Sequence, residues 1–65
     1  MTPARKAALQ WFHDRGEIKH PWDQPGAPSY RIIMTMVQEA QIDWTAKGGY
    51  ALTDKGRRML HGDDL

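Results

Sequence analysis

The chain has 65 residues, which is room for one domain with a modest core, and it has no cysteine, which excludes a disulfide scaffold and a thiolate zinc site. Nine Lys and Arg against eight Asp and Glu give a formal net charge of +1, and this near balance argues against a strongly basic nucleic-acid coat protein. No apolar run approaches the roughly 20 residues that span a bilayer, and the first residues lack the apolar segment of a signal peptide, so we expect a soluble, cytoplasmic protein without a membrane partner.

The first predicted element is a helix over residues 3–15. Thr2 can cap its start, Pro3 suits the first helical position, and Gly16 can end it. At ~100° per residue the large apolar side chains fall on one side of this helix. They are Ala8, Leu9, Trp11 and Phe12. We therefore expect an amphipathic helix that buries one face.

A very short strand and a loop are predicted next. Residues 17–19 have room for a minimal strand only, and residues 20–28 contain three prolines, which remove backbone donors and fix φ. No regular helix of useful length fits there. Trp22 stands in the middle of this loop, and we expect it to fold back onto the core, with a functional surface role as the alternative.

Ser29 is predicted to cap a second helix that runs to about Ala40 or Gln41. A broad apolar face is predicted for this helix, made of Tyr30, Ile33, Met36, Val37 and Ala40. A polar face lies opposite, made of Arg31, Thr35 and Gln38. Because Ile32 and Met34 flank the apolar face, we expect the helix to be covered on more than one side.

A β-hairpin and a short last helix complete the predicted order. Apolar residues alternate with others in residues 42–45 and 50–52, which is the period of half-buried strands. The turn between them, residues 46–49, contains two glycines that permit positive φ. Thr53 can cap the last helix and Gly62 can end it, and residues 62–65 are expected to fray.

Two segments of the second half carry a family pattern. Residues 37–42 read Val-Gln-Glu-Ala-Gln-Ile, and residues 50–60 read Tyr-Ala-Leu-Thr-Asp-Lys-Gly-Arg-Arg-Met-Leu. The first resembles the end of the recognition helix of winged helix-turn-helix domains, and the second matches the common ending of that family. Small winged-helix proteins of bacteriophages are a looser likeness. The resemblance covers most of residues 4–61 and implies one α+β winged-helix domain, with about three helices, a small antiparallel sheet and a short hairpin wing.

The proline-rich loop from Lys19 to Pro28 departs from the family pattern. Winged-helix domains have a further helix there, which crosses the DNA backbone and sets how the recognition helix enters the major groove. The matched residues also have folding roles of their own. Thr53 caps a helix, Gly56 permits close approach of that helix to its neighbour, and Leu52 points into the core.

The first functional hypothesis is binding of double-stranded DNA, in a domain that resembles transcription regulators. Arginine and glutamine can read guanine and adenine edges, and threonine can contact a thymine methyl group or a phosphate. The candidate residues on the second helix are Ser29, Arg31, Thr35 and Gln38. The candidate phosphate contacts are Lys47 at the wing tip and Lys55, Arg57 and Arg58 in the last helix. The alternative is an ordinary solvated face, with Glu39 weakening its positive field.

The second hypothesis is a protein-interaction module, either a homodimer or a domain that binds another protein. Three tryptophans and four methionines are many for so small an interior. Exposed aromatic or methionine surface suits partner binding. The candidate surface residues are Trp22, Met34 and Trp44. The alternative is that a small core uses every large residue it has.

Metal binding and catalysis are the third hypothesis, and the residue pattern does not favour them. The candidate ligands are His13, His20, His61, Asp63 and Asp64. They lack the close spacing of a zinc site, and the chain has neither a nucleophile motif nor a phosphate-binding glycine loop. We therefore predict no catalytic residue, no metal and no small-molecule cofactor.

Overall fold

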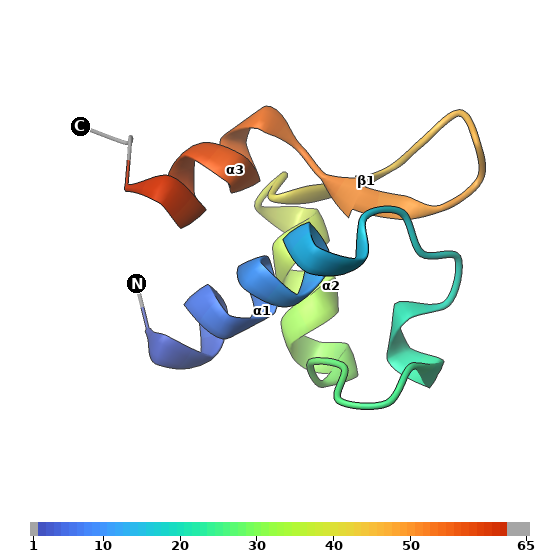
Figure 1. Cartoon of the computed structure of the whole chain (residues 1–65), viewed down its shortest axis with the longest axis horizontal. Coiled ribbons are helices and arrows are strands. Elements are labelled where there is room, and N and C mark those ends of the chain that lie inside the picture. The colour runs from blue at the N-terminus through green and yellow to red at the C-terminus, as the bar shows by residue number, and fades with distance from the viewer. Residues whose placement is uncertain (1, 63–65) are drawn as a thin grey trace.

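The computed structural model describes residues 2–62 as three α-helices and a two-stranded antiparallel sheet, which confirms the predicted α+β class. The elements in chain order are α1 (Pro3–Arg15), a 3₁₀ turn η1 (Pro21–Asp23), α2 (Tyr30–Gln38), β1 (Ile42–Trp44), β2 (Tyr50–Leu52) and α3 (Asp54–His61). Helix α1 contacts α2, α3 and β2, so it is the central element of the fold (Figure 1). The predicted fraying of residues 63–65 lies outside the described residues.

Helix α1 has the predicted boundaries, and its predicted buried face is confirmed except at Trp11, which is half-buried. The Thr2 hydroxyl accepts a hydrogen bond from the Arg5 amide, and the Gly16 amide donates to the Phe12 carbonyl in a conformation with φ of 77°. The buried side chains of this helix are Ala8, Leu9 and Phe12. Together with Ile33 and Met36 of α2 and Ile42 of β1, they form the hydrophobic core. No helix within residues 2–62 is both long and apolar enough to cross a bilayer.

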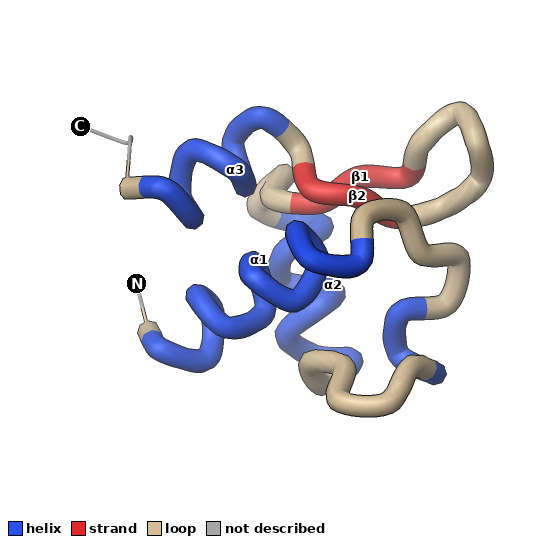
Figure 2. The backbone as a smooth tube through the Cα atoms, viewed as in Figure 1, coloured by secondary structure: helices blue, strands red, loops and turns tan. Residues whose placement is uncertain are grey.

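The loop between α1 and α2 returns to the hairpin. The strand predicted over residues 17–19 is reduced to one antiparallel bridge, in which Ile18 and Tyr50 exchange both backbone hydrogen bonds. Beyond this bridge, the prolines limit helical structure in the loop to the single turn η1, and Pro21 is buried. This loop and the hairpin turn lie at the end of the molecule away from the start of α1 and the end of α3 (Figure 2).

Helix α2 is shorter than the sequence predicts. It ends at Gln38, because Ala40 adopts a left-handed conformation with φ of 62°. The Ala40 amide donates to the Val37 carbonyl and the Gln41 amide to the Met36 carbonyl. These are the two hydrogen bonds of a Schellman motif, with alanine where glycine is usual. The prediction that the helix reaches Ala40 or Gln41 is therefore wrong.

The predicted apolar face of α2 is confirmed in its centre and wrong at both ends, since Ala40 is exposed and lies beyond the helix. Ile33 and Met36 are buried, and Val37 packs against the core. Tyr30, in contrast, is 60% exposed. The first turn of α2 lies beyond the core, so helical periodicity overestimates how far the buried face extends.

The hairpin and α3 agree closely with the prediction. Strand β1 pairs with β2 so that Ile42 faces Leu52 and Trp44 faces Tyr50. The Thr53 hydroxyl accepts a hydrogen bond from the Gly56 amide and caps α3, and Gly62 ends that helix in a left-handed conformation. Gly56 is buried, and a Cβ there would overlap the carbonyl oxygen of Gln41. This close approach joins α3 to the segment that connects α2 to β1.

Candidate functional site

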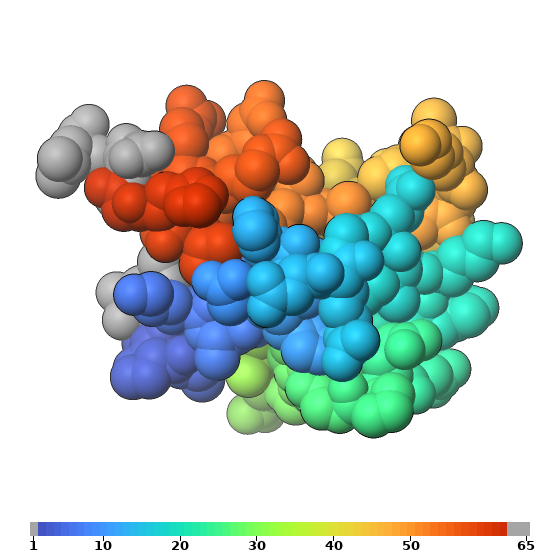
Figure 3. Space-filling model, viewed as in Figure 1, coloured from blue at the N-terminus to red at the C-terminus, as the bar shows by residue number. Residues whose placement is uncertain are grey.

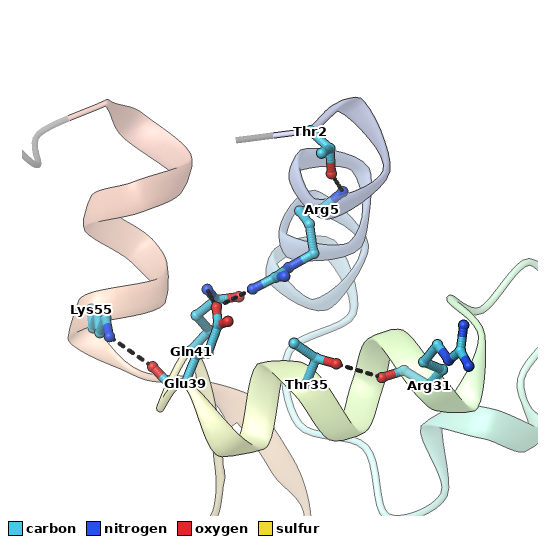
Figure 4. A network of polar contacts seen from close by, with 7 residues as sticks. All are labelled: Thr2, Arg5, Arg31, Thr35, Glu39, Gln41 and Lys55. Atoms are coloured by element: carbon cyan, nitrogen blue, oxygen red, sulfur yellow. Dashed lines mark hydrogen bonds and ion pairs between the residues drawn. The ribbon is translucent and has the colours of Figure 1, made fainter.

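The outward face of α2 carries two polar side chains that are free to meet a ligand. Arg31 and Gln38 are exposed, and no hydrogen bond among residues 2–62 engages either side chain. Thr35 is half-buried, and its hydroxyl donates to the Arg31 carbonyl at 2.9 Å (Figure 4). The Ser29 hydroxyl accepts from the Ile32 amide at 3.3 Å as the helix cap. Two of the four candidates on this helix, Ser29 and Thr35, therefore use their hydroxyls in hydrogen bonds to the backbone of α2.

A second basic group lies at the hairpin turn. Lys47 is exposed in this turn, where Gly48 has a φ of 91°. A Cβ built at Gly48 would lie 3.9 Å from Cε of Lys19 and 3.8 Å from the Trp44 ring. Lys19 therefore reaches the turn from the loop after α1. The sequence reasoning missed this residue because the bridge between Ile18 and Tyr50 that brings it there is a long-range contact.

Two of the three lysine and arginine residues of α3 bond within the protein, although all three are exposed. The Lys55 ammonium donates to the Glu39 carbonyl at 2.8 Å. Arg57 pairs with Asp54 and donates to the Leu52 carbonyl at 3.3 Å. Arg58 is exposed, but α3 lies at the other end of the domain from the hairpin turn (Figure 1). The structure thus brings Lys19 to the turn that contains Lys47 and leaves the α3 candidates apart from that turn.

Glu39 is the centre of a polar network that has a structural role. Its carboxylate pairs with Arg5 of α1 and accepts a hydrogen bond from the side-chain amide of Gln41 at 2.9 Å. Its backbone carbonyl accepts from the Lys55 ammonium (Figure 4). Gln41 is fully buried. The network joins the start of α1, the end of α2 and the start of α3. Because Arg5 neutralises Glu39, this acid does not oppose an anion at Arg31.

Four aromatic side chains that border solvent form a cluster, which we call the aromatic surface: Trp22, Tyr30, Trp44 and Tyr50. The Trp22 ring packs edge-to-face against Tyr30 at 5.9 Å and against Tyr50 at 6.1 Å between centroids. Trp44 packs in the same way on Tyr50 at 5.1 Å. The exposed fractions are 38% for Trp22, 53% for Trp44 and 60% for Tyr30, so the cluster borders solvent rather than forming part of the core.

Three separate elements build the aromatic surface: the loop with η1, the first turn of α2, and the hairpin. Figure 3 shows the loop and the hairpin turn packed against each other on one side of the molecule. The expectation that Trp22 folds back onto the core is wrong, because the ring packs against Tyr30 and Tyr50 and stays 38% exposed. Met34, the third residue of the predicted partner surface, is half-buried against the core. The sequence pattern does not single out Tyr30 and Tyr50, because it places both on buried faces.

The candidate metal ligands are scattered. The His13 and His61 rings lie 5.9 Å apart, and Nδ1 of His13 is 3.5 Å from an Asp14 oxygen. His20 instead packs on Trp22. No group of three or more histidine and carboxylate side chains in the described part of the chain could hold a metal ion. Asp63 and Asp64 lie outside the described residues.

The site is therefore a mixed surface with an aromatic centre. Lys19 lies near Trp44 at the hairpin turn, where Lys47 is also exposed, and Arg31 is exposed in the first turn of α2. Comparisons with models of protein families, with curated proteins and with solved structures found no match to the chain.

Proposed function

We propose that the chain is a small winged-helix binding domain that contacts double-stranded DNA through the outward face of α2 and the hairpin turn. The observation that carries the proposal is the exposure of Arg31 and Gln38 on α2, without partners among the described residues. The element order supports it, because Ile18 adds to the free edge of β2 while β1 pairs with the other edge. That arrangement suits a wing beside a recognition helix.

The proposed contacts divide by chemistry. Arg31 and Gln38 present the groups that hydrogen-bond guanine and adenine edges in the major groove. Lys47 and Lys19 at the turn can hold phosphates. Lys55 and Arg57 already bind carbonyls of the protein, so they contribute less. The loop with η1 occupies the position of the first helix of the helix-turn-helix motif in that family. It would set the orientation in which α2 enters the groove.

Salt dependence measures the number of phosphate contacts. With the two phosphate contacts of Lys19 and Lys47, the logarithm of the binding constant falls with a slope of about −1.8 against the logarithm of salt concentration. Between 50 and 200 mM KCl, affinity for a labelled duplex should then fall on the order of tenfold in fluorescence anisotropy. Binding that is absent at micromolar protein in low salt, or that ignores salt, refutes the proposal.

Two variants, each of which removes one positive charge, test which surface of the protein binds the duplex. Arg31→Ala should weaken duplex binding by about tenfold or more, because it removes a base contact. Lys6→Ala removes one positive charge from the exposed side of α1 and should leave affinity nearly unchanged. Equal losses in both variants would mean that net charge alone attracts the duplex.

A second candidate function is binding of a protein partner at the aromatic surface. The observation that favours it is the exposure of Trp22, Tyr30 and Trp44 in one connected cluster. Aromatic residues are enriched at the centres of protein interfaces. The partner can be a second copy of the chain, and light scattering after size exclusion tests that case. A monomer at high concentration leaves a different protein as the partner.

A further inference from the structure

The outward face of α2 offers only two side chains that can read a base. Arg31 and Gln38 are exposed on this helix, and no hydrogen bond within the described part of the chain engages their side chains. Thr35 lies between them in sequence, but it is half-buried and its hydroxyl donates to the Arg31 carbonyl at 2.9 Å (Figure 4). The other exposed residue of α2, Tyr30, packs against Trp22 instead. The reading surface of this helix is therefore limited to one guanidinium and one amide.

Helical geometry places these two side chains on one face of α2, about two turns apart. Seven residues at about 3.6 per turn fall only about 20° short of two full turns. At a rise of about 1.5 Å per residue, the Cα atoms of Arg31 and Gln38 are separated by about 10.5 Å along the helix axis. Gln38 is the last residue of α2, and the chain leaves the helix through Ala40 with a φ of 62°. No later residue of the helix extends this face, so both ends of the reading surface are defined.

The two side chains match different base edges. A guanidinium offers donors only, and its fork fits the two acceptors that guanine presents in the major groove, N7 and O6. A glutamine amide offers both an acceptor and donors, and it fits the N6 donor and the N7 acceptor of adenine. Arg31 is therefore matched to guanine and Gln38 to adenine.

The separation of these side chains sets the separation of the two bases. On a helix in the major groove, residues three or four positions apart contact neighbouring base pairs. Arg31 and Gln38 are two such intervals apart, with Thr35 between them, so they reach base pairs two steps apart. Base pairs rise about 3.4 Å along the duplex, so a helix aligned with the duplex axis would separate the contacts by about three steps. One or two unread base pairs therefore lie between the guanine and the adenine.

We propose that the chain prefers duplexes in which a guanine and an adenine are separated by one or two base pairs that α2 does not read. The inference rests on the proposed function and names the base pairs that its site selects. Replacement of either purine should weaken binding by about tenfold, because one paired contact is lost. Replacement of both should weaken binding by about a hundredfold, since well-separated contacts contribute nearly independently.

The test is a selection from duplexes with a randomised centre, followed by sequencing of the bound fraction. The expected result is enrichment of a guanine and an adenine at one fixed spacing, with one or two base pairs between them. Gln38→Ala should abolish the enrichment of adenine and keep that of guanine, and Arg31→Ala should do the reverse. Gln10→Ala, at an exposed glutamine of α1, is the matched control and should leave the selected sequence unchanged.

Salt dependence separates base contacts from phosphate contacts on the selected duplex. Gln38→Ala removes no charge, so it should weaken binding without changing the slope of affinity against salt concentration. Lys47→Ala should make that slope shallower by about 0.9 and keep the selected sequence, because it removes one phosphate contact. Circular dichroism of each variant confirms that it is folded before the comparison is made.

The outcomes separate this inference from the proposed function. Salt-sensitive binding with no enriched sequence would overturn the inference and leave the proposed function standing. An enriched sequence that Arg31→Ala and Gln38→Ala both leave unchanged would also overturn it, because other residues would then read the bases. Binding to no duplex in low salt would refute the proposed function together with the inference.

Discussion

Ala40→Gly should stabilise the domain, because position 40 is held in a conformation that glycine adopts without strain. The φ of 62° at Ala40 belongs to the left-handed region, which costs a residue with a Cβ roughly 1–2 kcal/mol. Glycine loses about 0.4–1 kcal/mol more conformational entropy on folding, so the two effects partly cancel. The expected net gain is about 0.5–1 kcal/mol in the free energy of unfolding. Ala40 is exposed, so its methyl group leaves no cavity.

Urea denaturation followed by circular dichroism measures this gain, with thermal unfolding as the second readout. For a domain of this size the melting temperature should rise by about 3–7 °C. Ala7→Gly is the matched control, because Ala7 is also exposed but lies inside α1. That change should destabilise by about 0.5–1 kcal/mol. A loss of stability in Ala40→Gly similar to that in Ala7→Gly would show that α2 does not end in the left-handed turn.

Three further predictions concern packing and capping. Gly56→Ala should cost about 2–3 kcal/mol by urea denaturation, because its Cβ would overlap the Gln41 carbonyl oxygen; a neutral result would mean that α3 lies farther from that carbonyl. Thr53→Ala should cost about 1–2 kcal/mol and Thr53→Ser much less, since the hydroxyl caps α3 and donates to the Ala40 carbonyl; equal costs would assign the effect to the methyl group. Trp44→Ala should cost about 1–2 kcal/mol in the free energy of unfolding, because the ring is 53% exposed but packs on Tyr50 across the hairpin; a loss above about 3 kcal/mol would make it a core residue.

Local signals in the sequence predict most of the secondary structure. Thr2, Ser29 and Thr53 each cap the next helix in the chain, as their side chains and neighbours predict. The hairpin register agrees with the alternation of residues around two turn glycines. These features depend on residues close in the chain, so sequence reasoning reaches them. The early end of α2 has no such signal, because an alanine occupies the position where glycine usually marks the stop.

The candidate site is harder to predict, because it depends on contacts between distant segments. Tyr30 fits the apolar period of α2, yet it ends beside Trp22, where no other described segment buries it. Polar residues of the same type also differ in whether they form hydrogen bonds within the protein. Lys55 and Lys47 are both exposed, but Lys55 donates to the Glu39 carbonyl, whereas no hydrogen bond among residues 2–62 engages the Lys47 side chain. Sequence alone does not show which donor finds an internal partner.

The most direct test of the DNA proposal is a map of amide shifts on binding duplex DNA in low salt. The proposal predicts that the largest changes fall at Arg31, Gln38 and Lys47, the exposed residues of α2 and the hairpin turn. Changes confined to α3 around Arg58, with α2 unaffected, would contradict it.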